Sequence, residues 1–148
     1  MYYDNQYGNH SASIFRENQK PIQEINKAIN DEFNAIHYYT RLAELAPNEQ
    51  FRQGILGVRQ DEIRHFSGFS RSYFELTGHF PNISLNVDLP ASFKKGIHHS
   101  IKDEKGTVPF YKEIASKITN PKIQNRFLRA AADEQRHYEL FSNVKSYL

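Results

Sequence analysis

Asp61-Glu62-Ile63-Arg64-His65 returns 72 residues later in the chain as Asp133-Glu134-Gln135-Arg136-His137. Each copy follows an Asp-Glu pair that lies thirty residues earlier, Asp31-Glu32 in the first case and Asp103-Glu104 in the second. Hydrophobic and aromatic residues recur with the same offset: Ile25 and Ile97, Ile29 and Ile101, Tyr39 and Tyr111, Leu56 and Leu128, Phe69 and Phe141. A repeat of this length is one supersecondary unit present twice. Two copies are too few for a solenoid, so a pair of helical hairpins explains the pattern better.

Each copy is expected to form two long helices, because its apolar residues recur at alternating steps of three and four. One face in the first copy contains Ile25, Ile29, Glu32, Ile36, Tyr39 and Ala43, and the next contains Phe51, Ile55, Val58, Glu62, His65, Phe69 and Leu76. The faces in the second copy contain Ile97, Ile101, Glu104, Val108, Tyr111 and Ile118, and then Ile123, Phe127, Ala130, Glu134, His137, Phe141 and Val144. Pro47-Asn48 and Asn120-Pro121 mark the two hairpin turns, since asparagine is a good helix N-cap. We expect the hairpins at about 18–77 and 91–148.

A linker of thirteen residues, 78–90, separates the hairpins and contains the helix breakers Pro81 and Pro90. Thirteen extended residues span roughly 43 Å, and a helix of ~28 residues is about 42 Å long. The linker can therefore cross the full length of a bundle and start the third helix parallel to the second. One long crossover in an all-α four-helix bundle is the ferritin-like connectivity. Residues 1–17, polar apart from their tyrosines and Ile14-Phe15, are expected to form a flexible N-terminal tail.

Composition limits the classes of partner and cofactor. A chain of 148 residues fits a single domain that can bury a substantial core. A net charge of +2 with 24% charged residues gives no field that would favour nucleic acid or a membrane surface. The absence of cysteine excludes disulfides, zinc–thiolate sites and cysteine-ligated iron–sulfur clusters. The first residues lack the plan of a signal peptide, and no apolar run approaches the ~18 residues of a membrane span. We expect a cytoplasmic protein.

Six ionisable residues lie on the core-facing sides of the four expected helices: Glu32, Glu62, His65, Glu104, Glu134 and His137. Buried ionised groups are costly without partners, and no Lys or Arg occupies these faces to neutralise them. A histidine three residues after a glutamate shares its helix face, so one helix can offer two ligands to one centre. Two divalent cations would balance four carboxylates. The alternative is a buried, hydrogen-bonded polar layer without metal, and the duplication of all six positions in register favours metal.

Carboxylates mixed with imidazoles suit iron or manganese, because structural zinc sites favour thiolates and calcium avoids imidazole. On these residues the chain resembles the ferritin-like di-iron carboxylate superfamily, and within it the bacterioferritin and rubrerythrin branches, over about residues 18–147. The shared pattern is a Glu on helices one and three and Glu-x-x-His on helices two and four. The resemblance implies that Glu32 and His65 are terminal ligands of one metal and that Glu104 and His137 are terminal ligands of the other. It also implies that Glu62 and Glu134 bridge the two metals.

The resemblance also implies residues that support the ligands. By similarity to bacterioferritin-like sites, Asp61 and Asp133 each hold the ligand histidine of the other half. Tyr39 and Tyr111 follow the ligands of helices one and three by seven residues. These two tyrosines are candidate catalytic residues, which hydrogen-bond a ligand carboxylate or supply an electron; the alternative is ordinary aromatic packing.

Other polar residues near the pattern have simpler expected roles. Asp31 and Asp103 are candidates for flanking salt bridges. The remaining histidines lie off the core-facing sides or in the linker and are expected at the surface: His37, His79, His98 and His99. Gly106 and Pro109 fall close to Glu104, where proline removes a backbone hydrogen bond and favours a local kink.

The sequence differs from bacterioferritins, rubrerythrins and ferritins at several positions, and these differences limit the cofactors and assemblies that we expect. Bacterioferritins bind haem through a methionine on helix two, and the only methionine here is Met1, so no haem is expected. Rubrerythrins have a further glutamate three residues after the third-helix ligand, where this chain has Thr107, and often a cysteine-rich domain. Eleven residues follow His137, too few for the fifth helix that completes ferritin cages.

The expected activity is that of an oxidoreductase in which two iron ions, as Fe(II), reduce O₂ or hydrogen peroxide, as in defence against oxidative stress. The sequence does not identify the electron donor. Two alternatives stay open: an iron-storage or metal-buffering protein without turnover, and a manganese catalase-like enzyme. We expect a homodimer with no nucleic-acid or membrane partner.

Overall fold

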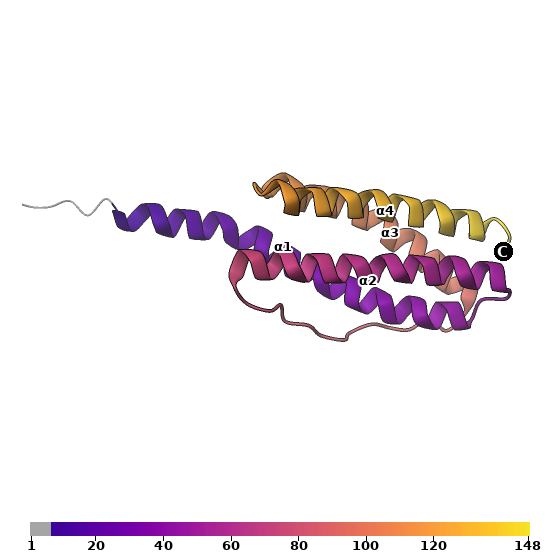
Figure 1. The fold of residues 1–148 in the computed structure, drawn as a ribbon. Coiled ribbons are helices and arrows are strands. Elements are labelled where there is room, and N and C mark those ends of the chain that lie inside the picture. Colours follow the sequence, from indigo (N-terminus) through magenta and orange to yellow (C-terminus); the bar gives the residue numbers. More distant parts are fainter. Residues whose placement is uncertain (1–6) are drawn as a thin grey trace, which may run out of the picture.

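The computed structural model describes residues 7–148, with side chains from residue 20 onward. It contains four helices and, within that range, no strand: α1 (Tyr7–Glu44), α2 (Glu49–Thr77), α3 (Phe93–Lys117) and α4 (Pro121–Lys145). Figure 1 shows that α1 and α2 form one hairpin and α3 and α4 the other, and that α3 runs parallel to α2. The predicted all-α four-helix bundle, with two hairpins and one long crossover, is confirmed.

Helix α1 begins earlier than the sequence suggested. The backbone of residues 7–17, which composition assigned to a flexible tail, is the first part of this helix. In Figure 1 this part of α1 projects beyond the ends of the other three helices. Residues 1–6 of the expected tail lie outside the described residues. Pro21 lies inside α1.

The turns and helix ends follow local sequence signals. The Asn48 side chain accepts a hydrogen bond from the backbone N–H of Phe51, and the Asn120 side chain accepts from the N–H groups of Lys122 and Ile123. Helix α2 ends at Gly78, whose φ of 71° lies in the left-handed region that glycine adopts without steric cost. Helix α3 is continuous across Pro109; the expected kink stays a prediction.

Two asparagines on α1 fix the path of the crossover. Asn30 donates to the carbonyl of Asn82 (2.7 Å) and accepts from the N–H of Ser84 (2.8 Å). Asn34, one helical turn later, donates to the carbonyl of Ser84 (3.1 Å) and accepts from the N–H of Asn86 (2.7 Å). The side-chain amides thus pair with alternate residues of an extended segment, as a neighbouring strand would. The crossover is therefore anchored along α1.

Buried side chains form two hydrophobic clusters, one on each side of a polar layer. One cluster contains Ile25, Ala28, Ile29, Phe69, Tyr111, Ile114, Ala115, Ile118, Ile123, Phe127, Ala130 and Ala131. The other contains Tyr38, Tyr39, Leu42, Ala43, Ile55, Val58, Ile97, Phe141 and Val144. Leu76, expected on the inner face of α2, is instead 40% exposed, and the face ends at buried Ser72. The polar layer between the clusters contains the repeated motif.

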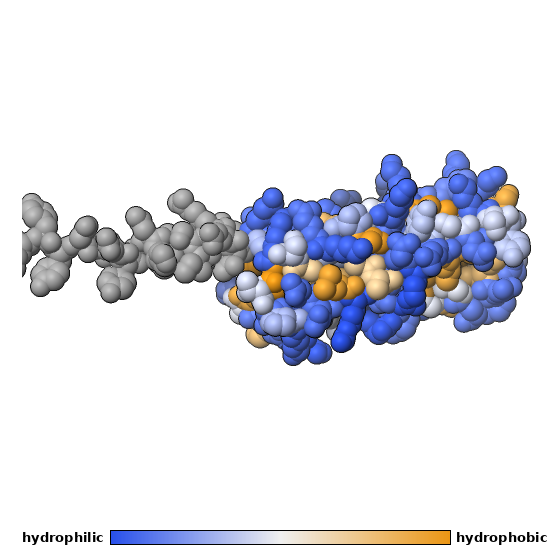
Figure 2. All heavy atoms as spheres, turned by 90° about the horizontal axis from the view of Figure 1, so that it is seen from above, coloured by the Kyte–Doolittle hydropathy of each residue, from blue (hydrophilic) through white to orange (hydrophobic). Residues whose placement is uncertain are grey.

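The outer surface is largely hydrophilic. Figure 2 shows polar side chains over most of one face, with apolar side chains gathered in a band along its middle. Several exposed apolar side chains belong to the crossover: Phe80, Ile83, Leu85 and Leu89. Among the described residues, no helix is long and apolar enough to span a membrane.

Two glycines provide a matched pair of substitutions that tests the packing of α3. A Cβ atom added at Gly96 would lie 2.4 Å from Leu42 Cδ1 and 3.0 Å from Pro90 Cβ, whereas one at Gly57 would meet nothing within 4 Å. Gly57→Ala should raise the free energy of unfolding by about 0.5–1 kcal/mol, because alanine favours the helix. Gly96→Ala should lower it by about 1–3 kcal/mol through overpacking. Urea unfolding measures both, and equal stability of the two variants would contradict the close approach at Gly96.

Candidate metal centre

The structure brings all six predicted ligand residues together in the polar layer. One comes from α1, one from α3 and two each from α2 and α4, and every one of them is buried: Glu32, Glu62, His65, Glu104, Glu134 and His137. Their exposed fractions are 2% for each residue except His65, which is 7% exposed. Helical periodicity explains this convergence, because each ligand takes the place of an apolar residue on the inner face of its helix.

Each histidine directs its Nδ1 atom toward three glutamates. His65 Nδ1 lies 3.2 Å from Glu32 Oε1, and it also lies 3.0 Å from Glu134 and 3.6 Å from Glu62. His137 Nδ1 lies 3.0 Å from Glu62, 3.6 Å from Glu104 and 3.8 Å from Glu134. The two arrangements correspond under the 72-residue repeat, which exchanges the two hairpins.

These residues form two overlapping groups that could each hold a metal ion. The first group contains Glu32, Glu62, His65 and Glu134, and the second contains Glu62, Glu104, Glu134 and His137. Within each group the ligand atoms all lie within 4.8 Å of one another. Glu62 and Glu134 belong to both groups. The geometry therefore offers each of two ions one private glutamate, one private histidine and two shared carboxylates.

The donor set fits bound cations because several inward-facing atoms have no hydrogen-bond partner. Among the described side chains, these buried atoms include Glu62 Oε1, Glu104 Oε2, Glu134 Oε1 and His137 Nδ1. Glu62 Oε1 and His137 Nδ1 are 3.0 Å apart but do not meet hydrogen-bond geometry. A buried polar atom without a partner costs roughly 1–3 kcal/mol. Cations coordinated by these atoms would remove that cost.

Burial and repulsion from neighbouring carboxylates hold protons on Glu32 and Glu104 in the metal-free centre. The pKa of Glu104 is raised from 4.5 to about 8, first by burial and then by the charge of Glu134. Burial, together with the charge of Glu62, raises the pKa of Glu32 well above its ordinary range. Glu32 and Glu104 therefore favour the protonated form at neutral pH when no metal ion is bound.

The histidines are protonated in the metal-free centre for the opposite reason. Burial opposes the charge on His65, but the nearby carboxylates of Glu134, Glu32 and Glu62 raise its pKa above the ordinary value. The pKa of His137 is raised in the same way, against burial, by Glu104, Glu134 and Glu62. Metal binding at Nδ1 must displace these protons.

Asp61 and Asp133 hold the far nitrogen of each histidine, across the two hairpins. His137 Nε2 lies 2.9 Å from Asp61 Oδ2, and His65 Nε2 lies 2.9 Å from Asp133 Oδ2. Burial raises the pKa of each aspartate, but the hydrogen bonds from the histidine and from a nearby arginine outweigh it and lower the pKa. The ionised aspartates thus keep the proton on Nε2 and leave Nδ1 for a metal ion.

Replacement of either aspartate by asparagine should weaken metal binding. Asp61→Asn and Asp133→Asn remove the charge that orients the histidine, and such losses typically cost 10–100-fold in metal affinity. Because the two positions correspond in the repeat, the two variants should lose affinity to a similar extent. Competition for Co(II) against a coloured chelator measures this loss. Native affinity in both variants would show that the Asp–His contacts do not tune the ligands.

Tyr39 and Tyr111 also contact the candidate ligands across the bundle. The hydroxyl of Tyr39 on α1 donates to Glu104 on α3, and the hydroxyl of Tyr111 on α3 donates to Glu32 on α1. Burial, then the charge of the contacted glutamate, raises the pKa of each tyrosine well above its ordinary range. Both phenols are therefore neutral hydrogen-bond donors at physiological pH.

The packing around the two tyrosines differs. Tyr111 meets Phe69 edge-on, with ring centroids 5.1 Å apart, and also meets Phe127 at 5.9 Å, inside the first hydrophobic cluster. Tyr39 stacks on Phe141 at 5.4 Å, and it also lines a cavity between α1 and α3. The Tyr39 side of the centre thus adjoins a cavity.

The remaining sequence candidates lie outside the ligand group. Asp31 pairs with Lys27, one turn earlier on α1. Asp103 has no ion-pair partner among the described side chains, and burial together with the charge of Glu104 raises its pKa. The four histidines expected at the surface are exposed: His37, His79, His98 and His99.

Comparison with known proteins identifies the family of this chain. The model of the rubrerythrin family matches residues 24–145 of this chain. The chain belongs to the rubrerythrin family. A relative in Bacillus subtilis (strain 168), the uncharacterized protein YhjR, is 42% identical over 123 residues, which cover 83% of this chain and 85% of the relative.

Two solved structures share the fold of this rubrerythrin-family chain. The bacterioferritin of Desulfovibrio desulfuricans has a TM-score of 0.78 at 21% identity, with 89% of this chain and 81% of that chain covered. A hypothetical protein from Pyrococcus furiosus has a TM-score of 0.76 at 16% identity, with 85% and 88% covered. The predicted membership of the ferritin-like di-iron superfamily is confirmed.

Sequence reasoning missed two supporting residues of this rubrerythrin-family site. Arg64 donates to Asp61, and Arg136 donates to Asp133 and lies 3.9 Å from Asp61. Both arginines fall inside the repeated five-residue motif, three residues after the aspartates they contact. Their recurrence with the 72-residue offset was the available signal, because i,i+3 pairs of opposite charge face each other on a helix.

Proposed function

We propose that this protein is a di-iron oxidoreductase that reduces O₂ or hydrogen peroxide at the centre described above. In this proposal Glu32 and His65 would hold one ion, Glu104 and His137 would hold the other, and Glu62 and Glu134 would be shared by both. The observation that carries it is the pair of overlapping ligand groups that share two carboxylates and contain unpartnered buried donor atoms. The bacterioferritin that shares this fold is described as having a diiron site in different catalytic states, which supports the assignment of iron.

The protein residues supply charge balance, orientation and exclusion of water. Two ferrous ions, when bound, provide one electron each, and hydrogen peroxide with two protons then yields two water molecules. Four carboxylates match the charge of two divalent ions and can adjust as that charge rises. Asp61 and Asp133 fix the tautomer of the ligand histidines. Burial of every ligand keeps bulk water away from the reacting ions.

Tyr39 and Tyr111 are proposed as catalytic residues of the same reaction. Each hydroxyl donates to a terminal glutamate, so it orients that carboxylate and holds a proton beside the centre. A phenol in this place can also supply one electron when the ions cannot. Tyr39 is the better placed of the two for exchange with solvent, because it adjoins the cavity between α1 and α3.

Anaerobic titration with Fe(II) followed by a measured amount of oxidant tests the proposal. We expect saturation at two Fe(II) per chain and oxidation of both ions by one equivalent of peroxide, faster than for free Fe(II) at the same pH. The surface variant Glu113→Gln should behave as the native protein. Saturation at one ion or none, or oxidation at the rate of free Fe(II), would contradict the proposal.

Metal analysis tests the assignment of iron over manganese, and native mass tests the oligomeric state. Protein isolated from its own cells is expected to contain iron, and manganese in its place would contradict the metal assignment. Native mass is expected to show a homodimer. A cage-sized assembly would instead indicate storage.

A further inference from the structure

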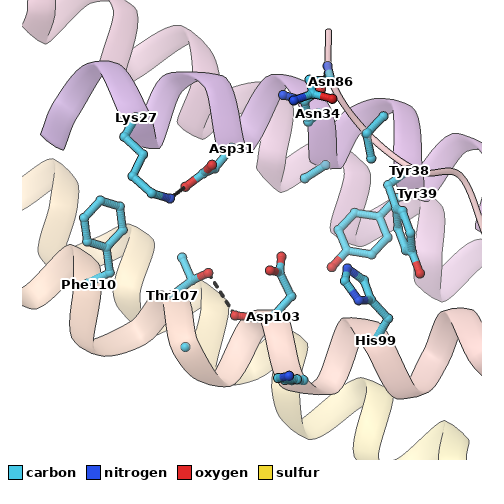
Figure 3. Close-up of a pocket in the computed structure, with 14 residues that line it drawn as sticks. Lys27, Asp31, Asn34, Tyr38, Tyr39, Asn86, His99, Asp103, Thr107 and Phe110 are labelled. Carbon is cyan, nitrogen blue, oxygen red and sulfur yellow. Dashed lines mark hydrogen bonds and ion pairs between the residues drawn. The ribbon is translucent and has the colours of Figure 1, made fainter. Parts of the chain in front are cut away.

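A cavity of about 530 Å³ lies between α1 and α3, and Figure 3 shows the side chains that line it. Its lining includes charged, aromatic and small residues, among them Tyr39, whose hydroxyl donates to the candidate ligand Glu104. The small residues Ala35, Gly106 and Thr107 line the cavity, and so does Asn34, which accepts a hydrogen bond from the crossover residue Asn86. A volume of this size is in the range of organic-ligand pockets, and O₂ or peroxide would fill a small part of it.

The lining consists of two copies of one arrangement, related by the sequence repeat. Lys27 and His99, Asp31 and Asp103, and Tyr38 and Phe110 are each 72 residues apart. One copy contains Lys27, Asp31 and Phe110, and Figure 3 shows Lys27 and Phe110 at one end of the cavity. The other copy contains His99, Asp103 and Tyr38, with His99 and Tyr38 at the opposite end. Each copy combines a carboxylate, an aromatic ring from the facing helix, and a basic side chain.

The first copy is filled by an ammonium group of the protein itself. The Lys27 Nζ atom forms an ion pair with Asp31 and lies 5.0 Å from the centre of the Phe110 ring. A carboxylate on one side and an aromatic face on the other are favourable contacts for an alkylammonium ion. Lys27 thus shows which chemical group this arrangement accepts.

The second copy has the corresponding carboxylate and aromatic ring, and Lys102 also lines the cavity on this side without forming an ion pair with Asp103. Asp103 has no Lys or Arg within ion-pair distance among the described side chains, and Figure 3 shows its carboxylate directed into the cavity. The Tyr38 ring is held in place by a hydrogen bond from its hydroxyl to the carbonyl of Gly96 (3.2 Å). His99, which stands where the first copy has Lys27, lies with its ring 5.2 Å from the Tyr38 ring and has no ammonium group. In the part of the chain that the structure describes, no protein ammonium group therefore pairs with Asp103 in the way that Lys27 pairs with Asp31.

We propose that the half-pocket formed by Asp103, Tyr38 and His99 binds the ammonium group of a small organic amine. The ammonium contacts the Asp103 carboxylate and the face of Tyr38, and the carbon chain extends along the cavity past Ala35 and Thr107. A metal ion is a poorer occupant, because one carboxylate and an aromatic face do not provide the several oxygen ligands that divalent cations require. This proposal does not depend on the proposed redox function, because no metal ligand lines the cavity.

Calorimetric titration of the chelator-treated protein with butylammonium chloride tests the proposal, with sodium chloride at matched ionic strength and butanol as the uncharged control. We expect one saturable site for butylammonium and binding at least tenfold weaker for butanol. Asp103→Asn should weaken butylammonium binding roughly tenfold, the effect of one lost charge-assisted contact. Glu113→Gln, an exposed carboxylate on the same helix, should leave it unchanged.

Two exchanges between the halves distinguish the proposal from a general loss of structure. His99→Lys should fill the second half-pocket with a protein ammonium and abolish the saturable binding. Lys27→Gln should open the first half-pocket and raise the stoichiometry from one butylammonium to two, a gain that misfolding cannot produce. Absence of saturable binding in the native protein, equal affinity for butanol, or unchanged binding in His99→Lys would overturn the proposal.

Discussion

The double variant Glu62→Gln/Glu134→Gln is expected to bind no metal and yet to be more stable than the native chain when both are free of metal. Both glutamates belong to both ligand groups, so their loss removes two ligands from each ion. In the metal-free native protein the same carboxylates contribute to the repulsion that forces protons onto Glu32 and Glu104. Their replacement by amides leaves two carboxylates to pair with two protonated histidines.

The expected gain in the free energy of unfolding is about 1 kcal/mol. This is the lower end of the range found when well-packed hydrophobic residues replace a buried ion pair, because glutamine keeps its polar atoms. Thermal unfolding in the presence of a chelator measures the gain, and titration with Co(II) measures the loss of binding. Glu32→Gln and Glu104→Gln serve as matched controls. Each removes a ligand of one group only, so each variant should retain one ion. Two ions bound by the double variant would show that these carboxylates do not bridge.

The second large effect is an opposite pH dependence of the metal-free and metal-loaded proteins. The pKa of Glu104 is raised from 4.5 to about 8, and the pKa values of both histidines are raised as well. The folded metal-free protein therefore binds more protons than the unfolded chain over this interval, so its stability must fall as pH rises from about 4.5 through about 8. Each unit of displaced pKa corresponds to about 1.4 kcal/mol.

Metal reverses the sign, because the ions take the place of the protons. Metal affinity should rise with pH over the same interval, and metal binding should release protons into a weakly buffered solution. Asp61 and Asp133 do not disturb this window, because their pKa values are lowered and they lose their charge only in more acidic solution. Denaturant unfolding at several pH values, with chelator and with Co(II), measures both trends. A metal-free protein that gains stability between pH 5 and pH 8 would contradict the protonation of the centre.

The fold and the ligand group could be predicted because both depend on periodicity and length. Each candidate ligand replaces an apolar residue at a helical spacing, so Glu62 and His65 had to share the inner face of α2. The crossover is long enough to return along the bundle, which fixed α3 parallel to α2. The repeat then required both halves to contribute equally.

Other features depend on contacts between residues that no local pattern connects. Asn30 and Asn34 look like ordinary polar residues on a helix surface, and only the path of the crossover gives them a partner. The cavity between α1 and α3 is lined in part by Ala35 and Gly106, which have little or no side chain. A sequence search for chemically active residues does not single out such positions. Periodicity also placed Leu76 on the inner face of α2. The helix extends beyond the hydrophobic core at this end, so the Leu76 side chain is exposed.

Anomalous diffraction at the iron absorption edge, from crystals loaded anaerobically with Fe(II), tests the two-metal centre most directly. We predict two iron peaks per chain. One should lie among Glu32, Glu62, His65 and Glu134, and the other among Glu62, Glu104, Glu134 and His137. A single peak, or peaks outside these six side chains, would contradict the central claim that the repeated motif builds a dinuclear iron site.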